Sequence, residues 1–287
     1  PDLDKFKKIV KEVGCAIIGQ TQNLTPADKK LYSIRDIAGT VESAPLITSS
    51  IMSKKIASGV KNLVLDIKVG NGSFNPTEEI ADKLAKSLVN VAKITGLNCH
   101  AILTDMNQIL GFNAGHSLEV IESIEFLIGK KTNNRLKEVT FNLSKELLCM
   151  NERNLKQDGA LKKINEVINN GKAAEKFEIM VNSLGGPKNI LSTYEKDLMM
   201  ASYHEDIFGK SDGYVESINT RELGLILIKI GGGRKQVSDN INYSVGYSNV
   251  INIGKKIDNN IPLMTIHTKH KEDVDEIRNK IKNCFVL

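Results

Sequence analysis

The fold is decided by the stretch Leu63-Val-Leu-Asp-Ile-Lys-Val69, Gly70-Asn-Gly-Ser-Phe74 and Pro76-Thr77-Glu-Glu. The first run is apolar and rich in β-branched residues, so it predicts a strand that ends at the glycine-rich loop. The proline and the threonine then open an amphipathic helix, which stops at Gly96. The side chains expected to point inward from this helix are Ile80, Leu84, Leu88 and Val91.

A second strand, Cys99–Thr104, follows this helix. A strand, a helix and a strand joined by short connections indicate a parallel βαβ unit, because parallel strands need such a crossover. We therefore predict an α/β protein with a mixed or parallel sheet. The other elements predicted before residue 185 are a buried strand over 13–19 and helices over 5–12, 44–57, 117–129, 134–150, 155–170 and 173–184.

The pattern of predicted elements changes near residue 210, from long helices to short strands and turns. Gly213–Ile218 alternates like a strand, and Thr220 is expected to cap a short apolar helix that runs to Ile230. Short strands separated by Gly and Asn-Asn turns follow, and a Lys-rich amphipathic helix over 272–284 ends the chain. We predict an α+β C-terminal unit over 211–287.

The candidate chemistry lies upstream, in Tyr32-Ser-Ile-Arg35-Asp-Ile-Ala-Gly-Thr40-Val-Glu-Ser43-Ala-Pro45-Leu-Ile-Thr-Ser-Ser50-Ile-Met-Ser-Lys54-Lys55. The proline suits the start of a helix, and the serine before it lies close enough to cap that helix. A single helical stripe then carries Ile47, Ser50, Ile51 and Lys54. Two apolar side chains, a hydroxyl and an ammonium suit a flat ligand with carbonyl acceptors on its edge. Spacing alone also allows a competing interpretation without a ligand, in which the arginine lies on the surface, the lysine lies at a helix end and the serine is incidental.

This run resembles the signature of the thymidine/pyrimidine-nucleoside phosphorylases, the class II nucleoside phosphorylases. The resemblance continues through Ala57–Phe74, Leu103-Thr-Asp-Met-Asn-Gln-Ile-Leu110 and Gly231-Gly-Gly-Arg234-Lys-Gln-Val-Ser-Asp239, so it covers essentially all 287 residues. It implies that Arg35, Ser50 and Lys54 hold a pyrimidine base by its carbonyl and N3 edge. It also makes Ile47, Ile51 and Phe74 candidate apolar walls around the base, with Tyr32 nearby. From the residues alone, plain core packing is the favoured interpretation of each of these four side chains.

The resemblance also implies a domain arrangement. In this family a small α domain and a larger α/β domain flank the active-site cleft, and the enzyme is a homodimer through the α domain. By resemblance, residues 27–57 belong to the α domain, residues 1–20 and 60–210 to the α/β domain, and residues 211–287 to the C-terminal α+β unit. No organic cofactor is implied. An alkali-metal ion, K⁺ or Na⁺, is held in some relatives by backbone carbonyls and one carboxylate, which match Leu110, Asn113 and Glu122.

Phosphate is the expected co-substrate, but its binding motif is missing from these residues. The family's loop is of the Lys-His-Ser-Thr-Gly-Gly type, and no equivalent occurs among the 287 residues. The catalytic histidine of that loop is absent with it, so we assign no catalytic residue. Because the chain starts at Pro1 rather than methionine, we expect that it begins inside a longer protein and lacks the N-terminal part.

Other polar groupings are less specific. Asp66 and Lys68 alternate on one strand face, and both a structural ion pair and a catalytic role remain open. Gly70-Asn-Gly72 and Gly231-Gly-Gly233 complete neither dinucleotide nor P-loop motif, so tight turns explain them better. His116 opens a helix, where a packing role is favoured over catalysis.

Composition excludes several classes of function. The net charge of +5, from 39 basic and 34 acidic residues, is too small to indicate nucleic-acid binding, because basic runs are interleaved with acids. Four scattered cysteines without a CxxC pair argue against zinc and disulfides and favour a cytoplasmic protein with reduced thiols. No apolar run approaches the roughly 20 residues of a membrane span, and we expect no membrane partner.

The leading hypothesis is phosphorolysis of pyrimidine (deoxy)nucleosides, thymidine above all, to the free base and (deoxy)ribose 1-phosphate. One alternative is a related glycosyl- or phosphoribosyltransferase that uses the same fold on another base. The other is a non-catalytic binding fragment, since the phosphate loop is absent.

Overall fold

The computed structural model describes residues 3–17, 19, 25–31, 43–236 and 239–287. The chain divides into two compact units. The first unit comprises residues 1–68, 77–104 and 139–190, and the second comprises residues 69–76, 105–138 and 191–287. None of the helices among the described residues combines the length and the apolar character that a bilayer span requires.

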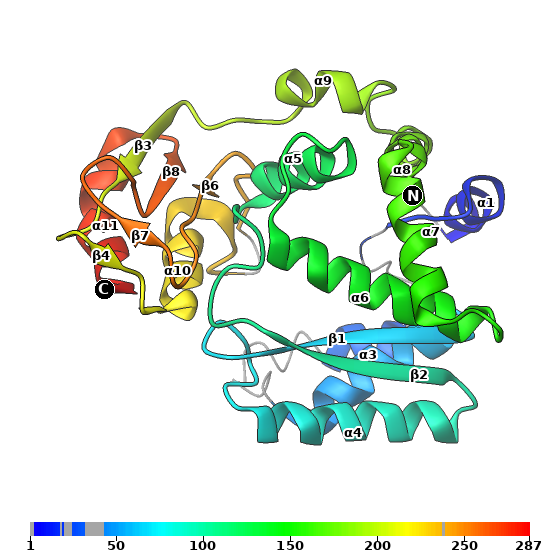
Figure 1. Cartoon of the computed structure of the whole chain (residues 1–287). Coiled ribbons are helices and arrows are strands. Elements are labelled where there is room, and N and C mark those ends of the chain that lie inside the picture. The colour runs from blue at the N-terminus through cyan, green and yellow to red at the C-terminus, as the bar shows by residue number, and fades with distance from the viewer. Residues whose placement is uncertain (1–2, 18, 20–24, 32–42, 237–238) are drawn as a thin grey trace. The chain divides into compact units, whose positions relative to one another are not determined.

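The first unit contains the predicted βαβ arrangement (Figure 1). Strand β1 (Asn62–Val69), helix α4 (Glu78–Ile94) and strand β2 (Asn98–Asp105) follow one another, and β1 pairs with β2 in a parallel sheet. Thr77 caps α4 by accepting a hydrogen bond from the Ile80 N–H, and Gly96, with φ of +77°, lets the chain leave the helix. The α/β class predicted from the sequence is confirmed.

The buried stripe of helix α4 agrees in part with the predicted one, because Leu84 and Leu88 are buried as expected and Val91 is half-buried. Ile80, expected inward, is 42% exposed, and the buried side chains are Ala81, Leu84, Ala85, Leu88 and Ala92. Three alanines in this stripe allow a close helix partner, which is α3 (Ala44–Ala57). The Thr48 hydroxyl of α3 donates a 3.0 Å hydrogen bond to the Ser87 hydroxyl of α4, so the two helices are also joined by a polar contact.

Helix α6 (Asn134–Asn151) lies along the β1–β2 sheet on the side opposite α4 (Figure 1). His100 Nδ1 on β2 lies 2.5 Å from Glu146 Oε1 on α6. Further along the unit, α1 (Leu3–Val13) and α7 (Gln157–Asn169) both pack against α8 (Lys172–Ser183). The buried strand predicted over 13–19 is wrong for the described part of that range, where no strand forms and Ile17 is 72% exposed.

The second unit is built on a three-stranded antiparallel sheet in the order β3–β8–β6. Its strands are β3 (Tyr203–Ile207), β6 (Gly246–Ser248) and β8 (Met264–Thr268). One face of this sheet packs into a core with helices α10 (Thr220–Leu227) and α11 (Lys271–Asn283). The remaining elements of the unit are α5 (His116–Leu127), α9 (Ile190–Asp197), the π-turn Ile228–Gly232, and the short strands β4 (Gly213–Tyr214), β5 (Ser217–Ile218), β7 (Lys256–Ile257) and β9 (Phe285–Val286).

One predicted helix cap is displaced by a residue. Asn219, not Thr220, caps α10, and its side chain accepts a hydrogen bond from the Glu222 N–H. Thr220 is instead the first helical residue, and its N–H donates to the Asn71 side chain at 2.7 Å. The side chain of Asn219 therefore satisfies a free N–H of the first turn.

Candidate functional site

Helix α3 holds two of the predicted base-binding residues in direct contact. Its bounds match the predicted range of 44–57, Ser43 is the N-cap residue, and Pro45 lies in the first turn. The Ser43 side chain makes no capping hydrogen bond, so the predicted side-chain cap is wrong although the position is right. One turn apart on this helix, Lys54 Nζ donates to Ser50 Oγ at 2.7 Å and to the Ser50 carbonyl at 2.8 Å.

The third partner of Lys54 is Asp28, a residue that the sequence reasoning missed. Residues 26–31 are helical, and Asp28 Oδ2 accepts a hydrogen bond of 2.5 Å from Lys54 Nζ. The side chains are 11% exposed for Asp28 and 26% for Lys54. An ammonium has three donors, and Asp28 and the two oxygens of Ser50 take all three. No local sequence motif links Asp28 to Lys54, which lies 26 residues further along the chain.

This arrangement determines what Ser50 can offer to a ligand. Because Ser50 Oγ already accepts from an ammonium, its own O–H remains the available donor. Among the described residues, no acceptor takes that proton. A hydroxyl polarised by a neighbouring cation is a stronger donor than an isolated one. Ser50 is only 6% exposed, and its O–H is a donor that none of the described residues uses.

The other predicted base contacts do not all lie in one unit or among the described residues. Ile47 and Ile51 lie on α3 and are half-buried. Phe74 lies on the loop after β1, in the second unit, and is 57% exposed. Tyr32 and Arg35 lie outside the described residues.

Removing the Asp28 carboxylate should destabilise the first unit. We expect Asp28→Asn to lower the free energy of unfolding by about 1–3 kcal/mol, because it leaves a partly buried ammonium without its counter-charge. Urea denaturation followed by circular dichroism measures this. The matched control is Glu12→Gln, which removes the exposed Lys8–Glu12 pair at 3.9 Å and should cost less than about 0.5 kcal/mol. Equal losses for the two variants would contradict a structural role for Asp28.

Asp66 and Lys68 form the ion pair that the sequence left open. Lys68 Nζ lies 2.7 Å from Asp66 Oδ2 and donates to Thr104 Oγ1 at 3.0 Å. The Thr104 hydroxyl in turn donates to Asp66 Oδ1. The three side chains satisfy one another across β1 and β2, which supports the structural interpretation.

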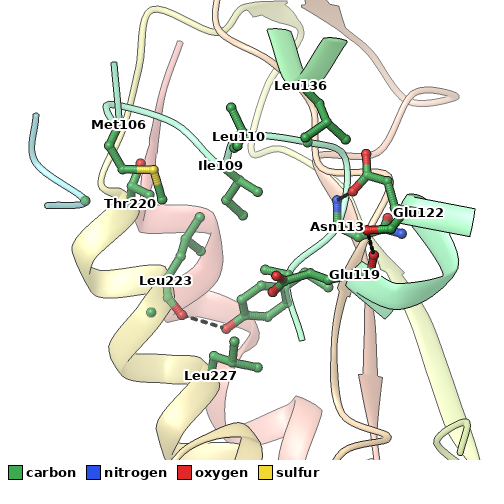
Figure 2. A pocket seen from close by; sticks show the side chains of 16 residues that line it. Met106, Ile109, Leu110, Asn113, Glu119, Glu122, Leu136, Thr220, Leu223 and Leu227 are labelled. Atoms are coloured by element: carbon green, nitrogen blue, oxygen red, sulfur yellow. Dashed lines mark hydrogen bonds between the residues drawn. The ribbon is translucent and has the colours of Figure 1, made fainter. Parts of the chain in front are cut away.

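The second unit contains a cavity of about 280 Å³ lined by the residues of the predicted cation site (Figure 2). Leu110, Asn113 and Glu122 all line it. Its apolar wall is formed by α10 with Leu223 and Leu227, by Ile109 from the segment after β2, and by Leu136 of α6.

Glu122 is the most deeply buried carboxylate of this cavity. Its Oε1 accepts from the Phe112 N–H at 2.7 Å and its Oε2 from the Asn113 N–H at 3.0 Å. A Cβ at Gly111 would lie 2.4 Å from this carboxylate, so only glycine admits the close approach. Burial raises the pKa of Glu122, while the two N–H donors favour the ionised form and limit the rise.

The three residues of the predicted cation site carry oxygen donors, namely two backbone carbonyls and one carboxylate. Among the described residues, no hydrogen bond reaches the carbonyls of Leu110 or Asn113, whereas the carbonyls of Ile109, Phe112 and Ala114 accept from Arg135, Val250 and Tyr247. Carbonyl and carboxylate oxygens are the ligands that hard cations prefer, so these donor types are compatible with such an ion. The described residues contain no cluster of three or more His, Cys, Asp or Glu side chains able to hold a metal.

The glycine-rich loop after β1 is a tight turn, as predicted. Gly70 has φ of +125°, and a Cβ there would lie 2.6 Å from Asn107 Oδ1. A Cβ at Gly72 would lie 2.7 Å from the Met106 carbonyl. Neighbouring backbone and side chains therefore explain both glycines without a bound phosphate.

Comparison with known families covers most of the chain. The family described as "Glycosyl transferase family, a/b domain" matches residues 1–174, which is more than half of the 287 residues. The family described as "Pyrimidine nucleoside phosphorylase C-terminal domain" matches residues 214–287. The α/β architecture and these two matches agree, and the chain belongs to the pyrimidine-nucleoside phosphorylase family of glycosyltransferases.

Proposed function

We propose that this protein catalyses the phosphorolysis of pyrimidine (deoxy)nucleosides, with thymidine as a preferred substrate. The products are the free base and (deoxy)ribose 1-phosphate. The observation that carries the proposal is the Ser50–Lys54–Asp28 cluster on and beside α3. The family membership supports the reaction type.

The chemistry requires stabilisation of a leaving group. As the N-glycosidic bond breaks, negative charge develops on the pyrimidine and spreads to its carbonyl oxygens. A fixed donor with a positive charge behind it stabilises that charge more in the transition state than in the ground state. In the proposal, the Ser50 hydroxyl donates to a base oxygen, Lys54 adds its charge, and Arg35 adds a planar fork of donors.

Apolar contacts complete the proposed base site. Ile47 and Ile51 would cover a face of the ring, and Phe74 and Tyr32 remain predicted contacts. The chain carries no Lys-His-Ser-Thr-Gly-Gly type motif, and we assign none of its residues to phosphate or to a catalytic acid or base.

The proposal includes no organic cofactor. We propose K⁺ or Na⁺ at Leu110, Asn113 and Glu122, where it would supply positive charge that neutralises the buried carboxylate. We also propose a homodimer in a reducing, cytoplasmic setting, for which the four free cysteines are suitable.

A substrate panel tests the reaction and its specificity. The full-length protein is assayed by chromatography with thymidine, uridine and a purine nucleoside, each with phosphate, and with free pyrimidines plus 5-phosphoribosyl pyrophosphate. We expect phosphate-dependent release of thymine and no turnover of the purine nucleoside. Calorimetric titration with thymine separates base binding from turnover. Binding without turnover would support the non-catalytic alternative, and turnover only with the pyrophosphate donor would support a phosphoribosyltransferase.

A further inference from the structure

Two histidines face each other on the sheet of the second unit, away from the cavity of Figure 2. His204 on β3 and His267 on β8 are register partners, so their side chains leave the same face of adjacent strands. Their rings are stacked with centroids 6.0 Å apart and planes inclined by 27°. The opposite face carries the buried Ile266 and Met264 of the core. The imidazole pair therefore lies on the face of the sheet that is not occupied by this core.

Ser248 orients one of these rings. Its Oγ lies 2.7 Å from His267 Nε2, and Ser248 is on β6, the strand on the other side of β8. When Nε2–H donates to this hydroxyl, Nδ1 keeps its lone pair. Metal-bound histidines use this arrangement, in which the second ring nitrogen is fixed by a hydrogen bond.

His267 is half-buried and His204 is exposed. Burial and the neighbouring His204 ring lower the pKa of His267. His204 is exposed and gives access from solvent. Asp206, two residues further along β3 on the same face, accepts a 2.6 Å hydrogen bond from Thr265 and adds negative charge to the rim.

We propose that His204 and His267 form a two-imidazole binding site for a borderline divalent cation such as Zn²⁺, Ni²⁺ or Cu²⁺. Imidazole selects these ions over Mg²⁺ and Ca²⁺, which prefer oxygen. The protein supplies two ligands, because the described residues contain no cluster of three. Water completes the coordination. The proposal is independent of the phosphorylase reaction.

The bound ion would act as a cross-link. It would join β3, an edge strand of the three-stranded sheet, to the central strand β8. A ligand that binds only the folded state stabilises that state by an amount that grows with the logarithm of its free concentration relative to its Kd. Metal binding should therefore raise the melting temperature of the second unit.

The experiment is a calorimetric titration of the whole chain with Zn²⁺ and with Ni²⁺, and Mg²⁺ as the selectivity control. We expect saturable binding of the first two, and at least about a tenfold weaker affinity in His204→Gln, since one of two ligands is lost. Ser248→Ala should weaken binding by about tenfold through loss of ring orientation. The matched control is His116→Gln, which removes an exposed imidazole whose ring partner is Tyr243 and should leave the affinity unchanged.

Thermal melts with and without Zn²⁺ distinguish lost metal binding from a folding defect in the variants. His204 is exposed, so His204→Gln should melt like the wild-type chain without metal and lose only the increase caused by Zn²⁺. His267→Gln is the second variant and should also lose the increase. Equal Zn²⁺ affinity in the wild type and His204→Gln, or no binding to the wild type, would overturn the proposal.

Discussion

Replacing Lys54 by methionine is expected to lower kcat/KM for thymidine phosphorolysis by about 10²–10³-fold. Methionine keeps most of the length and the apolar stem of lysine but removes the charge. The Ser50 hydroxyl then loses the cation that polarises it, and Asp28 loses its partner. Because the missing charge acts on the leaving base, most of the loss should appear in kcat rather than in KM.

The next residue supplies the matched control. Lys55 lies on the same turn of α3 and is exposed. Lys55→Met should change kcat/KM by less than about twofold, because a solvated charge off the Ser50 stripe contributes little. The measurement is the initial rate of thymine release over a range of thymidine concentrations. Similar losses in both variants would indicate a general effect of charge and would remove Lys54 from the base site.

The helix that carries this pair could be predicted from the sequence alone. Proline near the helix start and the recurrence of Ile47, Ser50, Ile51 and Lys54 are local signals, and the observed bounds of α3 match them. The contact between Ser50 and Lys54 is local as well, because residues four apart are neighbours on a helix. Sequence reasoning works here because each signal lies within one helix.

Asp28 could not be found in the same way. It lies 26 residues before Lys54, and no spacing rule connects two helices that pack through tertiary structure. The buried stripe of α4 was predicted only in part, for a related reason: Leu84 and Leu88 are buried as expected, but Ile80 is exposed. The sequence favoured the larger Ile80, but the partner helix α3 selects the small side chains of Ala81 and Ala85. Packing against a neighbour overrides the apolar periodicity of a single helix.

The second unit shows the same limit in its strands. No prediction covered α9 or β3, because β3 alternates between Tyr203, Glu205 and Ile207 on one face and polar side chains on the other. The inner face of β3 includes a charged residue, Glu205, which accepts a 2.7 Å hydrogen bond from Arg278 of α11. A partly exposed salt bridge at Glu205, in place of an apolar residue, weakens the alternating pattern by which a strand is predicted from sequence.

Replacing Glu122 by leucine is expected to lower the free energy of unfolding by about 2–5 kcal/mol. The leucine fills a similar volume but cannot accept the N–H groups of Phe112 and Asn113, which would remain buried without partners. Glu119→Leu on the same helix is the matched control. Glu119 is exposed and accepts one N–H, from Gly115, so its loss should cost about 1 kcal/mol or less. Chemical denaturation at neutral pH compares the two variants.

The pH dependence of stability separates hydrogen bonding from charge at Glu122. Its folded pKa is raised by burial, so ionisation opposes folding. The contribution of this group is most favourable below the unfolded pKa of about 4.3 and is lost as the pH rises through the folded pKa. Lys131 favours the ionised form and Glu119 opposes it. Glu122→Gln keeps one acceptor oxygen and does not titrate. Its stability relative to wild type should therefore improve as the pH rises, and a pH-independent difference would show that the hydrogen bonds alone set the role of Glu122.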